Sequence, residues 1–156
     1  MKNRGKQFEN KVREDWIKSV KGSTIDRLYD PTAGYVAISN ISDFIGYCYP
    51  NIFYIECKSR EGNTFPFQNL TQYEKLKDKV GIKGVRAGII LWFIDHDKVL
   101  YVPISSVTKM KEDGKKSINI KMLDEKLYNI YEIPSVKKRI FLDSDYSILT
   151  TLKEGE

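Results

Sequence analysis

The fold is decided by Ile41-Ser-Asp-Phe-Ile-Gly-Tyr-Cys-Tyr-Pro-Asn-Ile-Phe-Tyr-Ile-Glu-Cys-Lys-Ser59, a stretch with the pattern of a β-hairpin. Both flanks are rich in β-branched and aromatic residues, and Tyr49-Pro50-Asn51 supplies a turn between them. Counting outward from a turn centred between Tyr49 and Pro50 places Asp43 directly opposite Glu56. Opposed side chains share a face, with Cβ atoms about 4.5–5.5 Å apart. Side-chain alternation puts Lys58 on the same face as Glu56.

Two carboxylates and an ammonium on one sheet face are suited to binding a divalent cation and an activated water. Carboxylate oxygens are the hard ligands that Mg²⁺ prefers, and the backbone carbonyl of Cys57 offers a third oxygen. Lys58 is a compact cation that would orient the water or neutralise developing charge. The alternative is a solvated sheet face with a cross-strand ion pair. Opposed acidic residues destabilise a sheet unless they are compensated, either by a metal or by Lys58.

Two helices are expected around the hairpin. The first covers residues 4–20, because apolar residues recur there every fourth position and a further one widens the stripe: Phe8, Val12, Trp16, Val20 and Ile17. The second covers residues 70–80, with an inner stripe made of Leu70, Tyr73, Leu76 and Val80. Glycines at 81 and 84 mark its exit.

The strands of the sheet are predicted from apolar runs. Residues 87–94 are apolar almost throughout, which favours a central strand buried on both faces, and a turn at 95–98 leads to a partner strand at 99–104. The interval 24–40 reads as irregular, with a short strand near 34–38. The remainder predicts a short helix after Ser105, a basic loop at 111–116, a helical segment near 121–128 and a β segment at 139–142. These elements predict one domain over residues 1–156, with a mixed α/β or α+β core of order αβββαβ.

Composition narrows the class of protein. A chain of 156 residues with 41% hydrophobic residues is long enough to bury a core, and its net charge of +5 favours polyanionic partners only weakly. The N-terminus lacks an apolar signal-peptide core, and the longest apolar run is too short to span a bilayer. Two cysteines fit a reducing compartment and exclude a cysteine-based zinc site, with Cys57 expected as a buried thiol. We therefore expect a cytoplasmic protein that does not contact membranes.

Three further polar residues have two readings each. Glu9 lies beside the apolar stripe of the first helix and would reach the metal, but the residues alone favour an ordinary helix glutamate paired with Arg13. Gln72 would orient a water or a phosphate from the second helix, or simply face solvent, and the two readings are equally supported. His96, the only histidine, is interpreted as a surface turn residue.

The cations nearest the hairpin are the best candidates for contacts with phosphate groups. They lie in the N-terminal arm, on the first helix and at the end of the hairpin: Arg4, Lys6, Arg13 and Arg60. A second group, near the predicted basic loop, is interpreted as solvated: Lys109, Lys111, Lys115 and Lys116.

The arrangement of Asp43 and Glu56-x-Lys58 across a hairpin resembles the PD-(D/E)XK nuclease superfamily, whose fold is restriction-endonuclease-like. Closer features, over roughly residues 4 to 105, resemble RecU-type Holliday-junction resolvases of Gram-positive bacteria and their phages. These features are Arg4-Gly5, Phe8-Glu9, Ser42-Asp43-Phe44-Ile45-Gly46, Ile55-Glu56-Cys57-Lys58-Ser59, Phe65-Pro66, Asn69-Leu70 and the stretch from Gly88 to Pro103.

The resemblance implies a homodimeric, Mg²⁺-dependent endonuclease that binds branched double-stranded DNA and cuts four-way junctions on two strands, with Mn²⁺ able to replace Mg²⁺ and no small-molecule cofactor. By position, Asp43 and Glu56 become metal ligands, Lys58 the catalytic lysine and Glu9 a fourth member of the site. Gln72 matches the helix glutamine of the family when a small gap is allowed after Asn69.

One interval departs from the family pattern. RecU proteins carry a long stalk between the first helix and the Asp-bearing strand, whereas about twenty residues, Gly22 to Ser42, fill this interval here. A phage-type resolvase is therefore the expected variant. The competing hypotheses are a nuclease of the same fold that acts on other branched or duplex DNA, and a noncatalytic DNA-binding protein.

Overall fold

The hairpin forms with the predicted register. The computed structural model describes residues 3–29, 40–153 and 156. In it, β2 (Phe44–Cys48) runs antiparallel to β3 (Asn51–Arg60), with Phe44 opposite Ile55. Asp43 immediately precedes β2, so continuing the same register places it opposite Glu56, as predicted.

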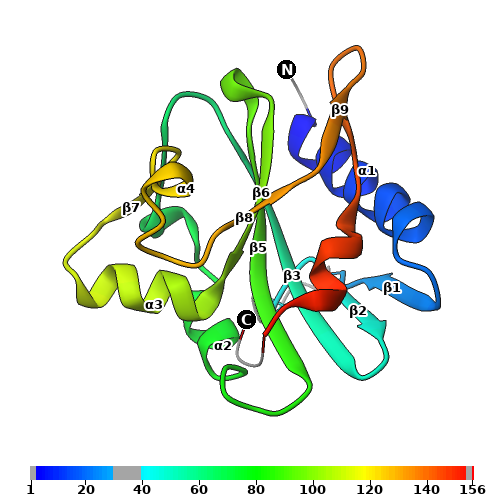
Figure 1. Cartoon of the computed structure of the whole chain (residues 1–156), viewed down its shortest axis with the longest axis horizontal. Coiled ribbons are helices and arrows are strands. Elements are labelled where there is room, and N and C mark those ends of the chain that lie inside the picture. Colours follow the sequence, from blue (N-terminus) through cyan, green and yellow to red (C-terminus); the bar gives the residue numbers. More distant parts are fainter. Residues whose placement is uncertain (1–2, 30–39, 154–155) are drawn as a thin grey trace, which may run out of the picture.

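The hairpin belongs to a six-stranded mixed sheet of order β1-β2-β3-β5-β6-β8. Its other strands are β1 (Ser23–Arg27), β5 (Val85–Phe93), β6 (Lys98–Pro103) and β8 (Tyr131–Ile133). Among the described strands, β3 and β5 are the one pair that runs in parallel, which requires a crossover, and α2 (Tyr73–Lys77) lies within it. The order α1, β1, β2, β3, α2, β5 confirms the predicted mixed α+β core (Figure 1).

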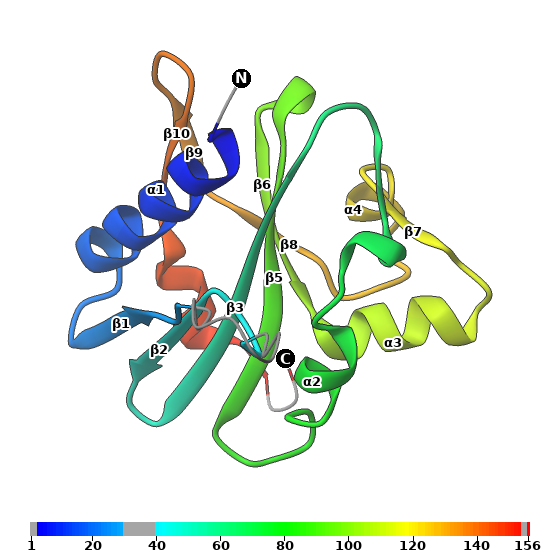
Figure 2. The same cartoon turned by 180° about the vertical axis from the view of Figure 1, so that it is seen from behind.

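Helices cover both faces of the sheet, as the two opposite views show (Figures 1 and 2). One face carries α1 (Arg4–Ser19), the 3₁₀ helix η3 (Tyr146–Thr151) and the hairpin of β9 (Ser135–Lys137) with β10 (Leu142–Ser144). The other carries α2, α3 (Ile104–Glu112), α4 (Met122–Glu125), the 3₁₀ helix η1 (Phe67–Asn69) and the pair β4 (Thr64–Pro66) and β7 (Ser117–Asn119). A further 3₁₀ turn, η2 (Ile94–His96), joins β5 to β6. None of the described helices combines the length and apolarity needed to cross a bilayer.

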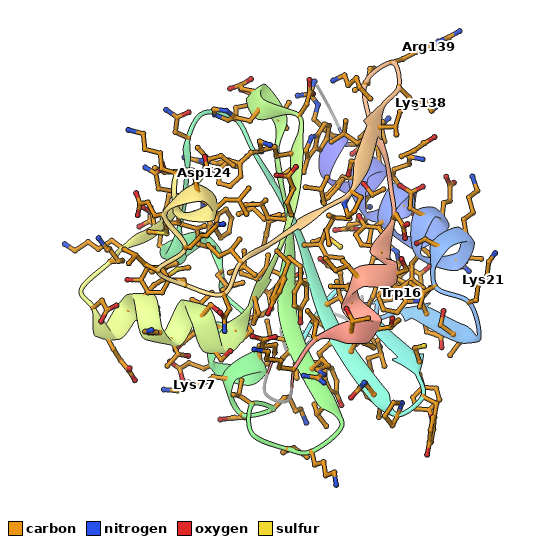
Figure 3. All side chains as sticks on the ribbon, viewed as in Figure 1. Trp16, Lys21, Lys77, Asp124, Lys138 and Arg139 are labelled. Atoms are coloured by element: carbon orange, nitrogen blue, oxygen red, sulfur yellow. The ribbon has the colours of Figure 1, made fainter. Side chains whose placement is uncertain are left out.

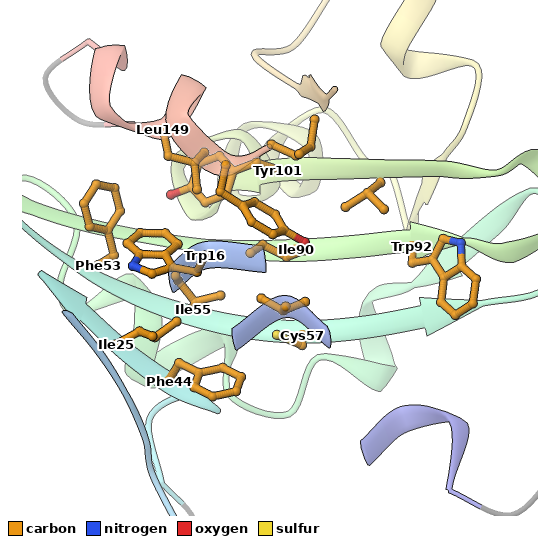
Figure 4. Packing of buried hydrophobic residues seen from close by; sticks show 14 of the residues in the cluster. Trp16, Ile25, Phe44, Phe53, Ile55, Cys57, Ile90, Trp92, Tyr101 and Leu149 are labelled. Carbon is orange, nitrogen blue, oxygen red and sulfur yellow. The ribbon is translucent and has the colours of Figure 1, made fainter. Parts of the chain in front are cut away.

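Helix α1 docks through the stripe that its sequence predicts. Phe8, Val12 and Trp16 are buried, and the Trp16 ring packs edge-on against Phe53, with centroids 5.3 Å apart (Figure 4). The strand beneath leaves room for this ring only because Gly46 has no side chain, since a Cβ there would lie 3.0 Å from Trp16 Cζ2. Packing of this kind fixes α1, and hence Glu9, against the start of the hairpin.

Several details of the predicted helices and strands are wrong. Ile17, expected to widen the buried stripe of α1, lies outside it and is 51% exposed. The second helix ends at Lys77, and Val80 is 36% exposed in a turn that leads to Gly81, whose φ is 89°. The segment expected to be irregular contains β1, which pairs with β2 along its whole length. The strand expected near 34–38 lies outside the described residues.

The C-terminal half also differs in detail. The basic stretch 111–116 starts inside α3, and the helical segment near 121–128 is reduced to the four residues of α4. The β segment predicted at 139–142 is found as β10, which pairs with β9. The sequence did not predict β8 or β9, because strands of three residues are too short to show an apolar pattern.

Candidate active site

Asp43 and Glu56 meet where the β2–β3 ladder ends. β2 pairs with β3 only as far as Ile55, so Glu56–Arg60 keeps β5 as a neighbour and has an open edge in the described part of the chain. Asp43 Oδ2 reaches this edge and accepts a hydrogen bond of 2.8 Å from the backbone N–H of Cys57. Because the N–H and C=O of one strand residue point to the same side, the Cys57 carbonyl also faces the open edge.

Glu56 is a buried carboxyl without full compensation. Its side chain is 1% exposed, and Oε2 has no hydrogen-bond partner in the described structure. Burial, followed by the hydrogen bond and the charge of Asp43, raises the pKa of Glu56 to about 10. Buried polar atoms in proteins are nearly always paired, so an orphaned carboxylate oxygen beside a second carboxylate fits a cation ligand.

Glu9 comes from α1 to the same place and is held there by Arg27. The distance between Arg27 Nη1 and Glu9 Oε2 is 2.6 Å, and the guanidinium lies over the Phe44 ring, 5.2 Å from its centroid. Burial raises the pKa of Glu9, and the charge of Asp43 raises it further. The pairing with Arg13 expected from helical spacing is therefore wrong: Arg27, on β1 opposite Phe44, takes that role.

Lys58 belongs to the same electrostatic cluster. Its charge opposes the rise in pKa of both Glu9 and Glu56, so the ammonium acts on the two carboxyl groups together. The Cys57 side chain is buried in the core instead, as predicted (Figure 4). Burial raises the pKa of this thiol, which keeps it protonated and leaves only its backbone for a ligand role.

Among the described residues, Gln72 makes no hydrogen bond to Glu9, Asp43, Glu56 or Lys58. It precedes α2, and its Oε1 accepts a hydrogen bond of 3.1 Å from the Thr71 hydroxyl. Its role stays a prediction. His96 lies exposed in the turn after β5, with Nε2 2.7 Å from Asn63 Oδ1, as its surface interpretation requires.

Three of the four predicted phosphate-binding cations line surface depressions, and Lys6 shares its depression with the carboxylates. Arg4 and Arg60 line one depression of about 470 Å³, and Lys6 lines another of about 460 Å³ together with Glu9 and Asp43. Arg13 is exposed and lines neither depression.

Within residues 3–29, 40–153 and 156, no three His, Cys, Asp or Glu side chains form a ready metal-binding group. The pair Asp43 and Glu56 therefore stands without a third protein side chain, and Glu9, the nearest candidate by charge coupling, is bound to Arg27.

The raised pKa of Glu56 predicts a pH-dependent stability. The folded pKa of about 10 lies above the ordinary value of 4.5, so the folded state binds more protons between these values. The stability that protonated Glu56 contributes is complete below pH 4.5 and is lost as the pH rises toward about 10. In EDTA, Glu56→Gln should therefore melt several degrees above wild type at pH 8.5 and close to it at pH 5. Calorimetry measures this difference, and a difference that stays constant with pH would contradict it.

Comparisons with known proteins agree with this geometry. The RecU family, described as Recombination protein U, matches residues 10–140. Among curated proteins none matches the chain in sequence. Among solved structures, the chain is similar to Hjc, a Holliday junction resolvase from the archaeal hyperthermophile Archaeoglobus fulgidus, at 16% identity and a TM-score of 0.52, over 74% of this chain and 88% of that one. That similarity shows a shared fold, and the family match covers most of the sequence, including Asp43, Glu56 and Lys58: the chain belongs to the RecU family.

Proposed function

We propose that the chain is a Mg²⁺-dependent endonuclease that resolves four-way DNA junctions by phosphodiester hydrolysis. The observation that carries this proposal is the pair formed by half-buried Asp43 and buried Glu56 at an open strand edge, with an orphaned oxygen on Glu56. Membership of the RecU family and the fold shared with Hjc, itself a Holliday junction resolvase, support the choice of substrate.

Asp43, Glu56 and the Cys57 carbonyl would hold the metal ion. Mg²⁺ is commonly bound through one or two carboxylates, waters and substrate phosphates, so two side chains and one carbonyl suffice. Oxygen ligands also suit Mn²⁺, which should replace it. The bound ion would polarise the scissile phosphate and lower the pKa of a water.

The chain's own residues would do the rest. Lys58 would neutralise charge that develops on the phosphate, because it already acts on both glutamates of the cluster. Glu9 would become available to a water or to the metal once Arg27 exchanges it for a phosphate oxygen, an anion that binds guanidinium well. Arg4, Lys6 and Arg60 would contact neighbouring phosphates, and Gln72 and Arg13 stay secondary candidates.

Resolution requires cuts on two strands, so we propose a homodimer that acts on branched DNA in the cytoplasm. A twofold assembly is the commonest closed oligomer and matches the symmetry of a junction. Sedimentation of the DNA complex tests this state, and a monomer on the junction would contradict it.

Substrate choice is tested with purified protein on a four-way junction, a flap and a linear duplex at matched salt, each with Mg²⁺ or EDTA. We expect cleavage only with the metal, and at least about tenfold faster on the junction, a discrimination of about 1.4 kcal/mol. Equal rates on all three substrates would favour a general nuclease of the same fold. Binding without metal-dependent cleavage on any of them would favour a noncatalytic protein.

A further inference from the structure

A second basic surface lies away from the carboxylates. A depression of about 770 Å³ is lined by Lys111, Lys115 and Lys116 together with Thr64, Phe67 and Gln68, and we call it the basic pocket. The sequence alone favoured a solvated loop for these lysines. The structure instead holds their backbone in place by hydrogen bonds and positions them around one depression.

The lysines stand on a well-tied backbone. Helix α3 ends in a turn where Gly114 has a φ of 83° and the N–H of Lys115 donates to Met110 O at 2.9 Å. The next residue joins this turn to η1, because the N–H of Phe67 donates to Lys116 O at 3.0 Å. β7 then pairs with β4, so both rims of the basic pocket belong to one hydrogen-bonded unit.

Its charge is also uncompensated. Among the described residues no acidic side chain lines the basic pocket. The nearby Asp113 is drawn elsewhere, since the Tyr128 hydroxyl donates to its Oδ2 at 2.8 Å. Lys111 Nζ lies 3.9 Å from the centroid of the Tyr73 ring, a contact that holds the ammonium without neutralising it. Three cations on a concave, carboxylate-free surface suit a row of phosphates.

The basic pocket lies within reach of DNA bound at the carboxylates. Thr64 follows Glu56 by eight residues, so their Cα atoms are at most about 29 Å apart. The link is short and tied, because Arg60 Nε donates to Thr64 O at 3.0 Å. One turn of duplex spans about 34 Å, and each of its strands carries a phosphate every ~3.4 Å. A single arm that enters the active site can therefore pass both places.

We propose that the basic pocket binds the phosphodiester backbone of the duplex arm that flanks the cleavage site. This inference rests on the proposed function for the position of the DNA, and it adds a surface that fixes the arm's direction. Phosphate contacts position a protein on DNA without reading sequence, so the basic pocket would contribute affinity and salt dependence rather than sequence preference.

The test is a paired charge removal, Lys115→Gln with Lys116→Gln, made in the Glu56→Gln protein and assayed in EDTA so that no DNA is cut. Affinity for a four-way junction is measured by fluorescence anisotropy over a range of salt. Loss of two phosphate contacts should lower the slope of log affinity against log salt by about 1–2 and weaken binding about tenfold or more. Lys115→Arg with Lys116→Arg should restore both.

The matched control is Lys18→Gln with Lys21→Gln, which removes the same charge from the last turn of α1 and the residues just after it. Figure 1 shows this end of α1 across the molecule from α3, and Figure 3 labels Lys21 there. It should leave the slope unchanged. An equal effect of both pairs, or no effect of the Lys115 and Lys116 pair, would overturn the inference. If the wild-type protein cuts no DNA while the pair still weakens binding selectively, the proposed function fails and the basic pocket stands. If the wild type cuts junctions and the pair binds normally, only the basic pocket fails.

Discussion

Glu56→Gln should bind a four-way junction about as tightly as wild type and cut it at least about 10³-fold more slowly, a loss of about 4 kcal/mol of transition-state stabilisation. The substitution keeps the shape of a side chain that is almost fully buried. What it removes is a carboxyl group that can release its proton to a bound cation and become an anionic ligand beside Asp43, and an amide cannot do this. Single-turnover cleavage with Mg²⁺ and anisotropy in EDTA measure the two quantities separately.

Asp43→Asn should behave in the same way, because the Asn oxygen can still accept the N–H of Cys57 while the negative charge is lost. Glu14→Gln is the matched control, since it removes an exposed carboxylate from α1 close to Glu9 in sequence. That control should cut at the wild-type rate. Rates near wild type in both Glu56→Gln and Asp43→Asn would refute the assignment of the site.

Gly88→Ala should cost about 3 kcal/mol of folding free energy, at the upper end of what overpacking of a core usually costs. A Cβ at this position would lie 2.4 Å from Cε1 and Cζ of Tyr101 and 2.5 Å from its hydroxyl oxygen. The ring has no room to retreat, because it is fully buried and its hydroxyl donates to Glu156 O at 2.9 Å. Thermal unfolding should show a fall in Tm of about 6–12 °C for a chain of this size.

Gly5→Ala provides the comparison, because a Cβ there meets nothing within 4 Å and alanine favours the helix. Its Tm should be equal to or slightly above that of wild type. Combining Gly88→Ala with Tyr101→Leu should recover part of the loss, since the smaller side chain removes the ring. A double-mutant cycle without coupling between the two positions would show that the clash is not the cause.

Sequence reasoning found the hairpin because its signals are local. The turn at Tyr49-Pro50-Asn51 and the alternation after it fix the register, and the register in turn places Asp43 opposite Glu56. The central strand β5 was equally visible, because residues buried on both faces read as one apolar run. Short strands such as β8 carry too few residues for a period to emerge.

Arg27 shows what the sequence could not supply. Helical spacing offered Arg13 as the partner of Glu9, and the strand expected in the interval 24–40 was placed near 34–38 rather than at β1. Only the pairing of β1 with β2 brings Arg27 beside Phe44 and so within 2.6 Å of Glu9. A missed edge strand thus became a missed member of the site. For Gln72 the reverse holds. Its position in the sequence matches the family motif, but its side chain accepts a hydrogen bond from Thr71 instead of contacting the carboxylates.

The hydrogen bond from Cys57 to Asp43 has a consequence for the life of the chain. The Asp43 side chain extends the pairing of β2 and β3 by one hydrogen bond, so the two carboxylates lie together where this pairing is complete. A chain that has not completed this sheet would therefore lack the assembled pair of carboxylates. Under the proposed function, cleavage of DNA would therefore require the completed sheet. A partly unfolded molecule in which β2 and β3 have separated would not cut DNA.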